Sequence, residues 1–364
     1  MAVTILLGLI TALLAIQTLV LLHNLWYWVG RDEPRGACRP ALSVLIPARN
    51  EIAALPRLAR ALAQQTFSPI EVLVYDDEST DGTAEWVRRE GMRWGLRLVP
   101  TRRRPAGWVG KTWACHQLAQ HARGEWMVFL DADLEPEPEL METLAGVCGV
   151  TGASLVTAIP RHTAGIWDGM VTALIPFSLF TLLVLRNAER HHHRSFSFAN
   201  GQVMAMRRAE YRDLWPHRAV RDAIVEDVLI ARMLKRLRLR VHVMDARPVL
   251  RVRMYHGLAD ALEGFSKNAS GICGGPGLAP LVAALLPVVY LLPLAPAAAG
   301  SLHALALCVW TGALVGVSCR LVGLPAWYGL VYPIPVALAE VALVRSLWWH
   351  RRGQVRWKGR VYVP

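Results

Sequence analysis

Two carboxylates separated by a single residue follow an apolar run in the middle of the chain. The run EWMVFL is followed directly by Asp131 and Asp133. In a turn, carboxylates at this spacing can reach one hard cation such as Mg²⁺ or Mn²⁺, which takes oxygen ligands and leaves positions open for phosphate oxygens. Such an ion would offset the charge of a departing diphosphate as a Lewis acid. The alternative is an acidic pair that caps the turn before Glu135 and Pro136.

A second acidic pair, Glu226 and Asp227, stands where a helical pattern begins in VEDVLIARMLKRL. Adjacent carboxylates suit the packing of an apolar helix face poorly, and burial would raise the pKa of one of them toward the working range of a general base. The pair is therefore a candidate for deprotonating an acceptor hydroxyl. The alternative is an acidic helix start that the helix dipole favours.

Two further polar segments follow apolar runs early in the chain. PARNE covers residues 47–51, where Asn50 and Glu51 offer polar groups suited to holding a base and a ribose. DDESTDGT covers residues 76–83, where adjacent carboxylates precede a turn-forming Asp-Gly pair. Taken alone, the first pattern is also an ordinary helix cap and the second an ordinary acidic turn.

Short strands that alternate with helices are expected to position these groups. We expect strands at 42–48, 70–77, 125–133 and 153–160, and leucines at helical intervals in 52–65 indicate a helix between the first two. Strand, helix and strand at this length predict an α/β fold with a mostly parallel sheet. Ligands of such sheets bind at the carboxyl ends of the strands, so we expect the chemistry in the loops after Pro47, Tyr75 and Leu130.

Long uncharged runs flank this α/β region. Residues 3–29 end in an aromatic cluster followed by arginines, which predicts an uncleaved membrane helix. No charged residue occurs between Lys267 and Arg320, and 321–339 is again uncharged, so two or three further membrane helices are expected. The apolar run 169–185 is expected to lie in the interface, because a crossing there would separate the acidic motifs across the membrane.

The predicted organisation has four parts. They are a membrane anchor (1–30), a catalytic region (41–270) with an interfacial helix at about 165–186, C-terminal membrane helices (277–347) and a basic tail (348–364). The tail's charge predicts that it lies in the cytoplasm, with the catalytic region, at the inner (plasma) membrane. One crossing before the catalytic region and three after it would place the tail outside, so one C-terminal segment is expected to be re-entrant.

Composition agrees with membrane association and argues against a nucleic-acid partner. The chain is 54% hydrophobic and 19% charged. Its net charge of +12 lies largely beside apolar runs, without a zinc-finger or basic-helix motif, so an anionic phospholipid bilayer and a pyrophosphate substrate explain it better. The six cysteines form no Cys-x-x-Cys pair, which is typical of reduced core residues.

In this order, the segments PARNE, DDESTDGT, DAD and VED resemble the glycosyltransferase family 2 proteins, whose fold is named GT-A. The resemblance covers roughly residues 41–270, and the ordered set is far more specific than any single segment. It implies a Rossmann-like α/β domain that moves a sugar from a nucleotide diphosphate sugar by single displacement, with inversion at the anomeric carbon.

The resemblance also implies roles for individual residues. Asp131 and Asp133 would face the diphosphate and the metal ion, Mg²⁺ or Mn²⁺. Asp227 would be the base, and Glu226 its supporting neighbour. The nucleoside pocket would be lined by Ala48, Asn50, Glu51 and Asp77.

Three more residues take roles from the same resemblance. Lys111, within GWVGKTWA, lies where family members often carry a lysine that faces the diphosphate. Gly201, within FANGQ, would let the backbone approach the sugar in the acceptor-side loop. Lys267, within GFSKN, is placed at the diphosphate, in a stretch where processive members carry Gln-x-x-Arg-Trp. Without that tryptophan, a processive polysaccharide synthase is disfavoured.

The surroundings of the motifs predict a lipid acceptor. The membrane helices and the run 169–185 would form its groove, and the ending 357–360 resembles members that glycosylate carotenoids and hopanoids. We expect UDP-glucose as donor, and as acceptor a hydroxyl or carboxyl of a carotenoid, hopanoid or sterol-like lipid, or a polyprenyl phosphate. If the acceptor is already ionised, Asp227 would orient it. The alternatives are a non-catalytic membrane scaffold with this fold and a nucleotidyltransferase, which would be expected to begin with a Gly-rich basic loop.

Overall fold

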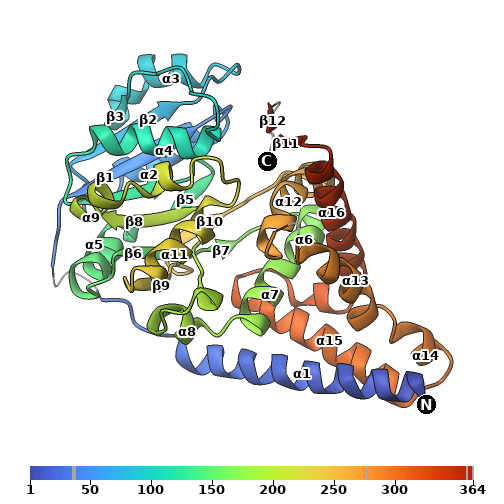
Figure 1. The fold of residues 1–364 in the computed structure, drawn as a ribbon. Helices are drawn as coiled ribbons and strands as arrows, with labels where there is room; N and C mark the ends of the chain where they lie inside the picture. Colours follow the sequence, from blue (N-terminus) through green and yellow to red (C-terminus); the bar gives the residue numbers. More distant parts are fainter. Residues whose placement is uncertain (35–37, 276, 358–359, 363–364) are drawn as a thin grey trace. The chain divides into compact units, whose positions relative to one another are not determined.

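The chain folds into two compact units, which are seen in the computed structural model as a sheet unit and a helical unit (Figure 1). The structure describes residues 1–34, 38–275, 277–357 and 360–362. The sheet unit comprises residues 30–161 and 186–252. The helical unit comprises residues 1–29, 162–185 and 253–364. These units cut across the predicted parts, since 162–185 and the residues after 252 group with the apolar helices.

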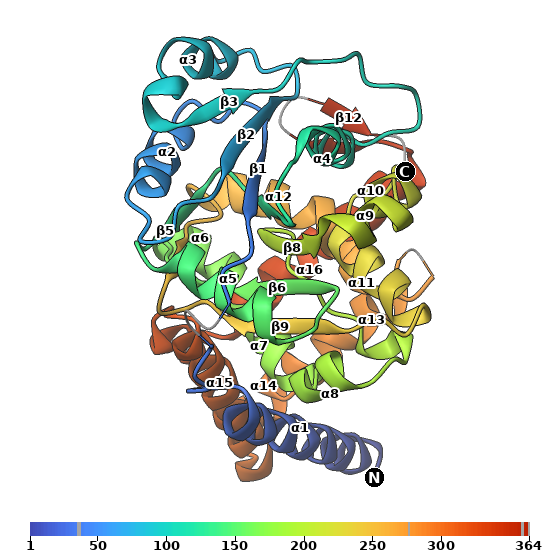
Figure 2. The same cartoon turned by 90° about the vertical axis from the view of Figure 1, so that its left-hand side faces the viewer.

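A seven-stranded sheet, in the order β3-β2-β1-β4-β8-β6-β9, forms the centre of the sheet unit. Its strands are β1 (Leu42–Ala48), β2 (Glu71–Asp76), β3 (Leu96–Leu98), β4 (Trp126–Leu130), β6 (Leu155–Ile159), β8 (Val203–Arg207) and β9 (Val241–Asp245). The strands β3, β2 and β1 run side by side in Figure 2 and pair in parallel. The mostly parallel α/β sheet is therefore confirmed. The antiparallel β8, between β4 and β6, was not predicted.

Helices precede and follow these strands along the chain. They are α2 (Leu55–Ala63), α3 (Thr83–Arg89), α4 (Gly110–His121), α5 (Leu140–Val150), α8 (Leu185–Arg190), α9 (Arg208–Leu214), α10 (Pro216–Ala219) and α11 (Glu226–Arg236). Short elements complete the unit: η1 (Gly91–Trp94), η2 (Arg194–Phe196), β7 (Arg161–His162) and the antiparallel pair β5 (Leu134–Pro136) and β10 (Leu250–Val252).

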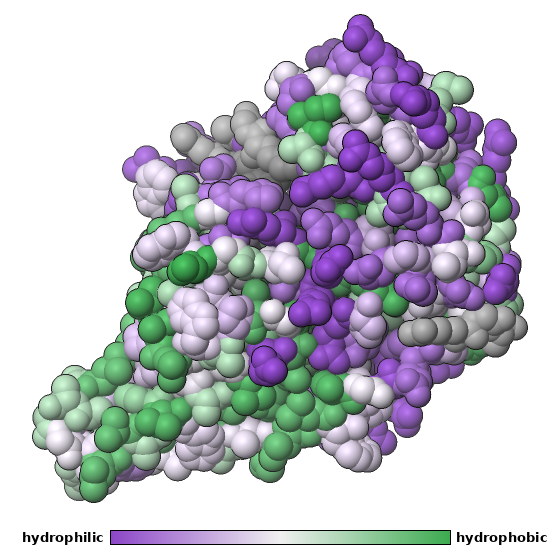
Figure 3. Space-filling view, turned by 180° about the vertical axis from the view of Figure 1, so that it is seen from behind, coloured by the Kyte–Doolittle hydropathy of each residue, from purple (hydrophilic) through white to green (hydrophobic). Residues whose placement is uncertain are grey.

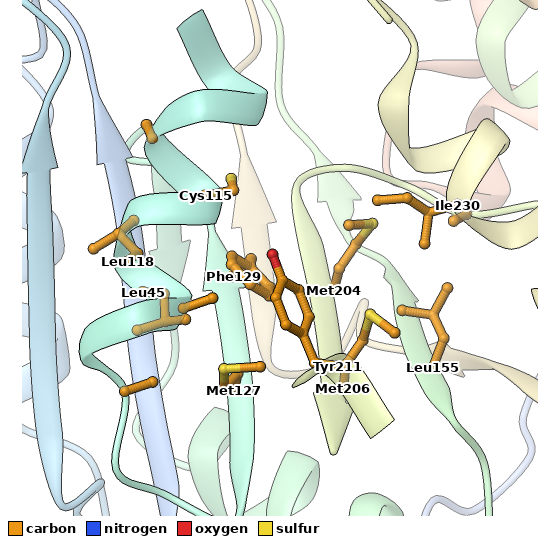
Figure 4. Packing of buried hydrophobic residues seen from close by; sticks show 14 of the residues in the cluster. Leu45, Cys115, Leu118, Met127, Phe129, Leu155, Met204, Met206, Tyr211 and Ile230 are labelled. Carbon is orange, nitrogen blue, oxygen red and sulfur yellow. The ribbon is translucent and has the colours of Figure 1, made fainter. Parts of the chain in front are cut away.

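One apolar core anchors two helices of the site, α4, whose first turn contains Lys111, and α11, which begins at Glu226. Leu118 of α4 and Ile230 of α11 belong to the same buried cluster as Phe129 and Met204 of the sheet (Figure 4). Burying apolar side chains stabilises such a cluster by roughly 25 cal/mol per Å². Because α4 and α11 are both packed into this cluster, their first residues are held at fixed positions relative to the sheet.

The helical unit is built from apolar helices and a short hairpin. Its elements are α1 (Ala2–Tyr27), α6 (Ile166–Thr172), α7 (Leu174–Leu182), α12 (Leu258–Ile272), α13 (Ala279–Tyr290), α14 (Leu294–Ala298), α15 (Leu302–Leu321), η3 (Ala326–Gly329), α16 (Pro333–Arg351), β11 (Val355–Trp357) and β12 (Arg360–Tyr362). Within the described residues, three helices are long and apolar enough to cross a membrane: Val3–Tyr27, Ala279–Ala298 and Leu302–Leu321.

The surface of these helices supports association with a membrane. Leu9 and Ile16 of α1 and Leu302 and Leu305 of α15 are exposed apolar side chains. Figure 3 shows hydrophobic residues gathered over this part of the helical unit. The predicted interfacial segment forms α6 and α7, a shorter apolar stretch than the three candidate spans.

The C-terminal ending pairs with itself within the helical unit. Strands β11 and β12 form an antiparallel hairpin, and β11 contacts α12 and α16. The ending 357–360, whose resemblance is described above, also includes Lys358 and Gly359, which lie outside the described residues.

Polar contacts make α1 an integral part of the helical unit. The buried Asn24 donates hydrogen bonds from its side-chain amide to the carbonyl oxygens of Phe180 (2.9 Å) and Leu183 (2.7 Å). Its amide oxygen accepts a bond from the Leu185 N–H at 2.9 Å. Asn24 thus satisfies the backbone groups that are released where α7 ends and α8 begins.

We predict that Asn24→Leu lowers the thermal unfolding temperature of the detergent-solubilised protein by several degrees. The substitution leaves buried backbone groups without partners, and each such group costs about 1–3 kcal/mol. Leu22→Ala, at an exposed position of the same helix, is the matched control and should unfold close to the wild type. Equal unfolding temperatures for Asn24→Leu and this control would contradict the role of Asn24.

Candidate active site

Charged groups from three segments and the backbone of a fourth meet at one edge of the sheet. The ammonium Nζ of Lys111 lies 2.8 Å from Asp131 Oδ1 and 3.3 Å from Glu226 Oε1, and it donates a hydrogen bond of 3.1 Å to the Gly201 carbonyl oxygen. The carboxylate of Asp227 accepts a hydrogen bond of 2.7 Å from the Gly201 N–H. The structure therefore brings together five of the predicted site residues.

The pairing of β4 with β8 explains this meeting. The two strands are antiparallel, with Leu130 opposite Val203. The residues that follow β4 and those that precede β8 consequently lie at the same edge of the sheet. The Asp131 N–H donates a hydrogen bond of 3.1 Å to the Gln202 carbonyl oxygen, which fixes the two segments against each other.

Lys111 is the cation that offsets the charge of this cluster. Burial alone would lower the pKa of Lys111, but the carboxylates of Asp131 and Glu226 raise it well above its usual value. The amine is therefore protonated throughout the physiological range. Its side chain is 33% exposed, so it remains accessible to a bound ligand.

Asp227 is the group whose charge changes near neutral pH. Burial, together with the negative charge of Glu226, raises the pKa of Asp227 to about 6, against the opposing effects of Lys111 and of the Val228 and Gly201 N–H groups. Proton transfer is most efficient when the pKa of the base lies near the operating pH. A pKa in this range is compatible with a general base, and the assignment of Asp227 to that role stays a prediction.

The ends of β1 and β2 form a second polar region. Asp77 donates its N–H to the Ala48 carbonyl oxygen at 2.8 Å, which continues the pairing of the two strands. Asn50 has left-handed backbone (φ 53°), and its N–H donates to Ser79 Oγ at 2.9 Å. The Asn50 side-chain oxygen accepts a bond of 2.8 Å from the Thr80 N–H. Asn50 therefore ties the two loops together, a role that its predicted place in a nucleoside pocket did not include.

Asp81, predicted as part of a turn, and Thr83, which the sequence interpretation did not single out, complete this region. The carboxylate of Asp81 accepts bonds from Thr83 Oγ1 (2.6 Å) and the Ile52 N–H (3.1 Å), while Thr83 Oγ1 accepts the Glu51 N–H at 2.9 Å. An aspartate two residues before a threonine at a helix start is typical of such a turn. The assignment of Ala48, Asn50, Glu51 and Asp77 to the nucleoside stays a prediction.

Asp131 and Asp133 provide a donor set that suits a hard divalent cation. Both side chains are half-buried at the end of β4. Among the described residues, no group of three or more His, Cys, Asp or Glu side chains is arranged to hold a metal ion. Mg²⁺ in phosphate-transferring sites is commonly bound by one or two carboxylates, with phosphate oxygens and water completing its shell. The two aspartates fit an ion of that kind, held jointly with a substrate.

Lys267 is placed differently from the other predicted site residues. It lies on α12 in the helical unit and is partly buried. Its assignment to the diphosphate stays a prediction.

Comparisons with known proteins identify similar chains. Residues 43–210 match the sequence model of glycosyl transferase family 2. The chain is 28% identical over 253 residues to a 4,4'-diaponeurosporenoate glycosyltransferase of Staphylococcus haemolyticus (strain JCSC1435), covering 68% of this chain and 66% of the relative. It is 29% identical over 241 residues to the enzyme of the same name from Staphylococcus aureus (strain USA300), covering 65% and 62%. The chain thus spans slightly less than two thirds of these relatives' lengths.

A solved structure supports the fold. The mannosyltransferase PcManGT of Pyrobaculum calidifontis, in complex with GDP-Man and Mn²⁺, superposes with a TM-score of 0.61 at 21% sequence identity. The superposition covers 94% of this chain and 99% of the mannosyltransferase. The family match and this shared fold confirm the predicted GT-A fold and family resemblance. Residues 43–210 are thus similar to glycosyl transferase family 2, and the chain shares its fold with this mannosyltransferase.

Proposed function

We propose that this chain is an inverting glycosyltransferase that moves a sugar from a nucleotide diphosphate sugar to a lipid acceptor at the membrane. The observation that carries the proposal is the position of Asp227, a base with a pKa of about 6, beside the Lys111–Asp131 pair. A base for the acceptor and a cation for the leaving group are the two groups that a single displacement needs.

The donor side of the site consists of Asp131, Asp133 and Lys111. The aspartates would hold Mg²⁺ or Mn²⁺, which supplies Lewis-acid stabilisation to the diphosphate. The Lys111 ammonium would approach the diphosphate oxygens and stabilise the charge that develops as the bond to the sugar breaks. The mannosyltransferase PcManGT, whose fold is similar, is named as a complex with GDP-Man and Mn²⁺. This supports the proposal that the present chain uses a nucleotide sugar and a divalent cation. We propose UDP-glucose as the first donor to test.

The acceptor side depends on Asp227. In the proposed step, an acceptor oxygen attacks the anomeric carbon, the bond from that carbon to the diphosphate breaks, and the diphosphate leaves with the bonding electron pair. A hydroxyl acceptor gives its proton to Asp227. Attack opposite the leaving group inverts the configuration of the anomeric carbon.

An apolar acceptor is supported by the surroundings of the domain. The relatives are named for diaponeurosporenoate, the anion of a carboxylic acid. Three helices of the described chain are long and apolar enough to cross a membrane. We propose that the sheet unit works at the cytoplasmic face of the inner membrane on a carotenoid-like or similar lipid. A carboxylate acceptor is already ionised, and Asp227 would then orient it.

We predict that membranes containing the protein transfer label from UDP-glucose to extractable lipid in the presence of Mn²⁺. With a hydroxyl acceptor, Asp227→Asn should lower this rate at least 100-fold. With a hydroxyl acceptor, the wild-type rate should fall about tenfold per pH unit below pH 6, because Asp227 becomes protonated. A carboxylate acceptor should abolish this dependence on Asp227 ionisation.

The Asp227→Asn variant should remain folded, because a raised pKa means that the charged carboxylate is unfavourable in the native state. Its unfolding temperature at pH 8 is expected to equal or exceed that of the wild type. Undiminished transfer by Asp227→Asn would contradict the proposed base. Label in a water-soluble polymer would favour a processive synthase, and no transfer from any nucleotide sugar would favour a scaffold.

We predict that UDP with Mn²⁺ raises the unfolding temperature of the wild type, and that Asp133→Asn loses this metal-dependent increase. The reason is that the carboxylate would be one of two protein ligands to the ion. Asp222→Asn, an exposed acidic position of the same unit, serves as control and should keep the full increase. Wild-type behaviour of Asp133→Asn would exclude this residue as a metal ligand.

A further inference from the structure

The Gly201 peptide unit lies between the two charged groups of the proposed mechanism. Its N–H donates to the Asp227 carboxylate at 2.7 Å, and its carbonyl oxygen accepts a bond from Lys111 Nζ at 3.1 Å. A Cβ atom at this position would lie 3.2 Å from both Asp227 Oδ2 and Lys111 Nζ, and 3.3 Å from Glu226 Oε1. A side chain here would therefore crowd all three charged groups.

The direction of this peptide is set by its neighbour Asn200. The Asn200 side-chain amide donates to the Ala158 carbonyl oxygen at 3.1 Å and to Gln202 Oε1 at 3.0 Å. Its side-chain oxygen accepts the Gln202 N–H at 3.2 Å. These bonds fix the turn on both sides of Gly201.

Asn200 is in turn held by a buried threonine of the sheet. Thr157, in β6, accepts the Asn200 N–H on Oγ1 at 2.8 Å and donates the same hydroxyl to the Asn200 carbonyl oxygen at 3.2 Å. The Thr157 side chain is fully buried. A single hydroxyl thus bonds both backbone groups of Asn200, from a strand adjacent to β8 in the sheet. The Asn200 carbonyl oxygen also accepts the Val203 N–H at 3.2 Å.

We infer that Thr157 is a positioning residue of the transfer reaction. Through Asn200 it directs the Gly201 N–H toward Asp227 and the Gly201 carbonyl toward Lys111, and so it holds the acceptor side and the donor side in one geometry. This inference rests on the proposed function and assigns Thr157 no contact with substrate.

The hydrogen bond from Gly201 also affects the charge of Asp227. That bond favours the ionised carboxylate, whereas burial and Glu226 of the same helix disfavour it and Lys111 of α4 favours it. A turn that rotates the Gly201 N–H away would therefore raise the pKa of Asp227 further. The charged form of Asp227 would then cost more in the folded protein.

Thr157→Val removes the hydroxyl at nearly constant volume. We predict that it lowers kcat about tenfold to 100-fold and leaves the KM for the nucleotide sugar within about twofold. The reason is that misplaced reacting groups slow the chemical step rather than donor binding. Thr157→Ser keeps the hydroxyl and should restore most of the rate. The matched control is Thr143→Val, since Thr143 is equally buried but bonds its hydroxyl only to the Glu139 carbonyl of its own helix.

A stability measurement tests the same inference without activity. Thr157→Val should lower the unfolding temperature more in the wild-type background than in the Asp227→Asn background at pH 8, and this difference should shrink at pH 5, where Asp227 is protonated. Thr143→Val should lower it equally in both backgrounds. If Thr157→Val matches Thr143→Val in kcat and in both backgrounds, the inference is overturned. Absence of transfer by the wild type, with the coupling intact, would overturn the proposed function alone.

Discussion

The charge balance around the Gly201 peptide is the constraint on which the site depends. Lys111 lies 2.8 Å from Asp131 and 3.3 Å from Glu226, while Asp227 is held by the N–H group of Gly201. Carboxylates gathered at this distance repel one another, and the ammonium offsets that repulsion. The lysine pairs directly with Asp131 and Glu226, whereas the pKa of Asp227 is raised to about 6. The three carboxylates therefore differ in how easily they take up a proton.

The sheet makes this balance rigid. Strand β8 enters antiparallel between β4 and β6, so that the turn before it meets the end of β4. The helices that begin at Lys111 and at Glu226 are both anchored in the core cluster that contains Phe129 and Met204. Groups held in this way need little reorganisation when charge develops during a reaction, which is the main source of electrostatic stabilisation in enzymes.

Local patterns predicted the strands and the acidic groups at their ends, but not the contacts that connect them. The strand at 42–48 was predicted with its observed bounds, and Asp131 and Asp133 do follow a strand, whereas Glu226 and Asp227 begin α11 as predicted. Thr157 was predicted only as part of a strand. Its contact with Asn200, which is 43 residues away, depends on the pairing of β8, and β8 was not predicted. Asn24 was predicted only as part of an apolar span, because its hydrogen-bond partners are distant in the sequence and come close only in the folded chain.

The account's central claim is a single displacement in which Asp227 serves the acceptor and the Lys111–Asp131 pair serves the leaving diphosphate. The most direct test is the anomeric configuration of the product, measured by NMR of the glycolipid that is formed from an α-linked nucleotide sugar. A single displacement predicts a β-linked product. An α-linked product would contradict the account, because it requires a second displacement or attack from the side of the leaving group.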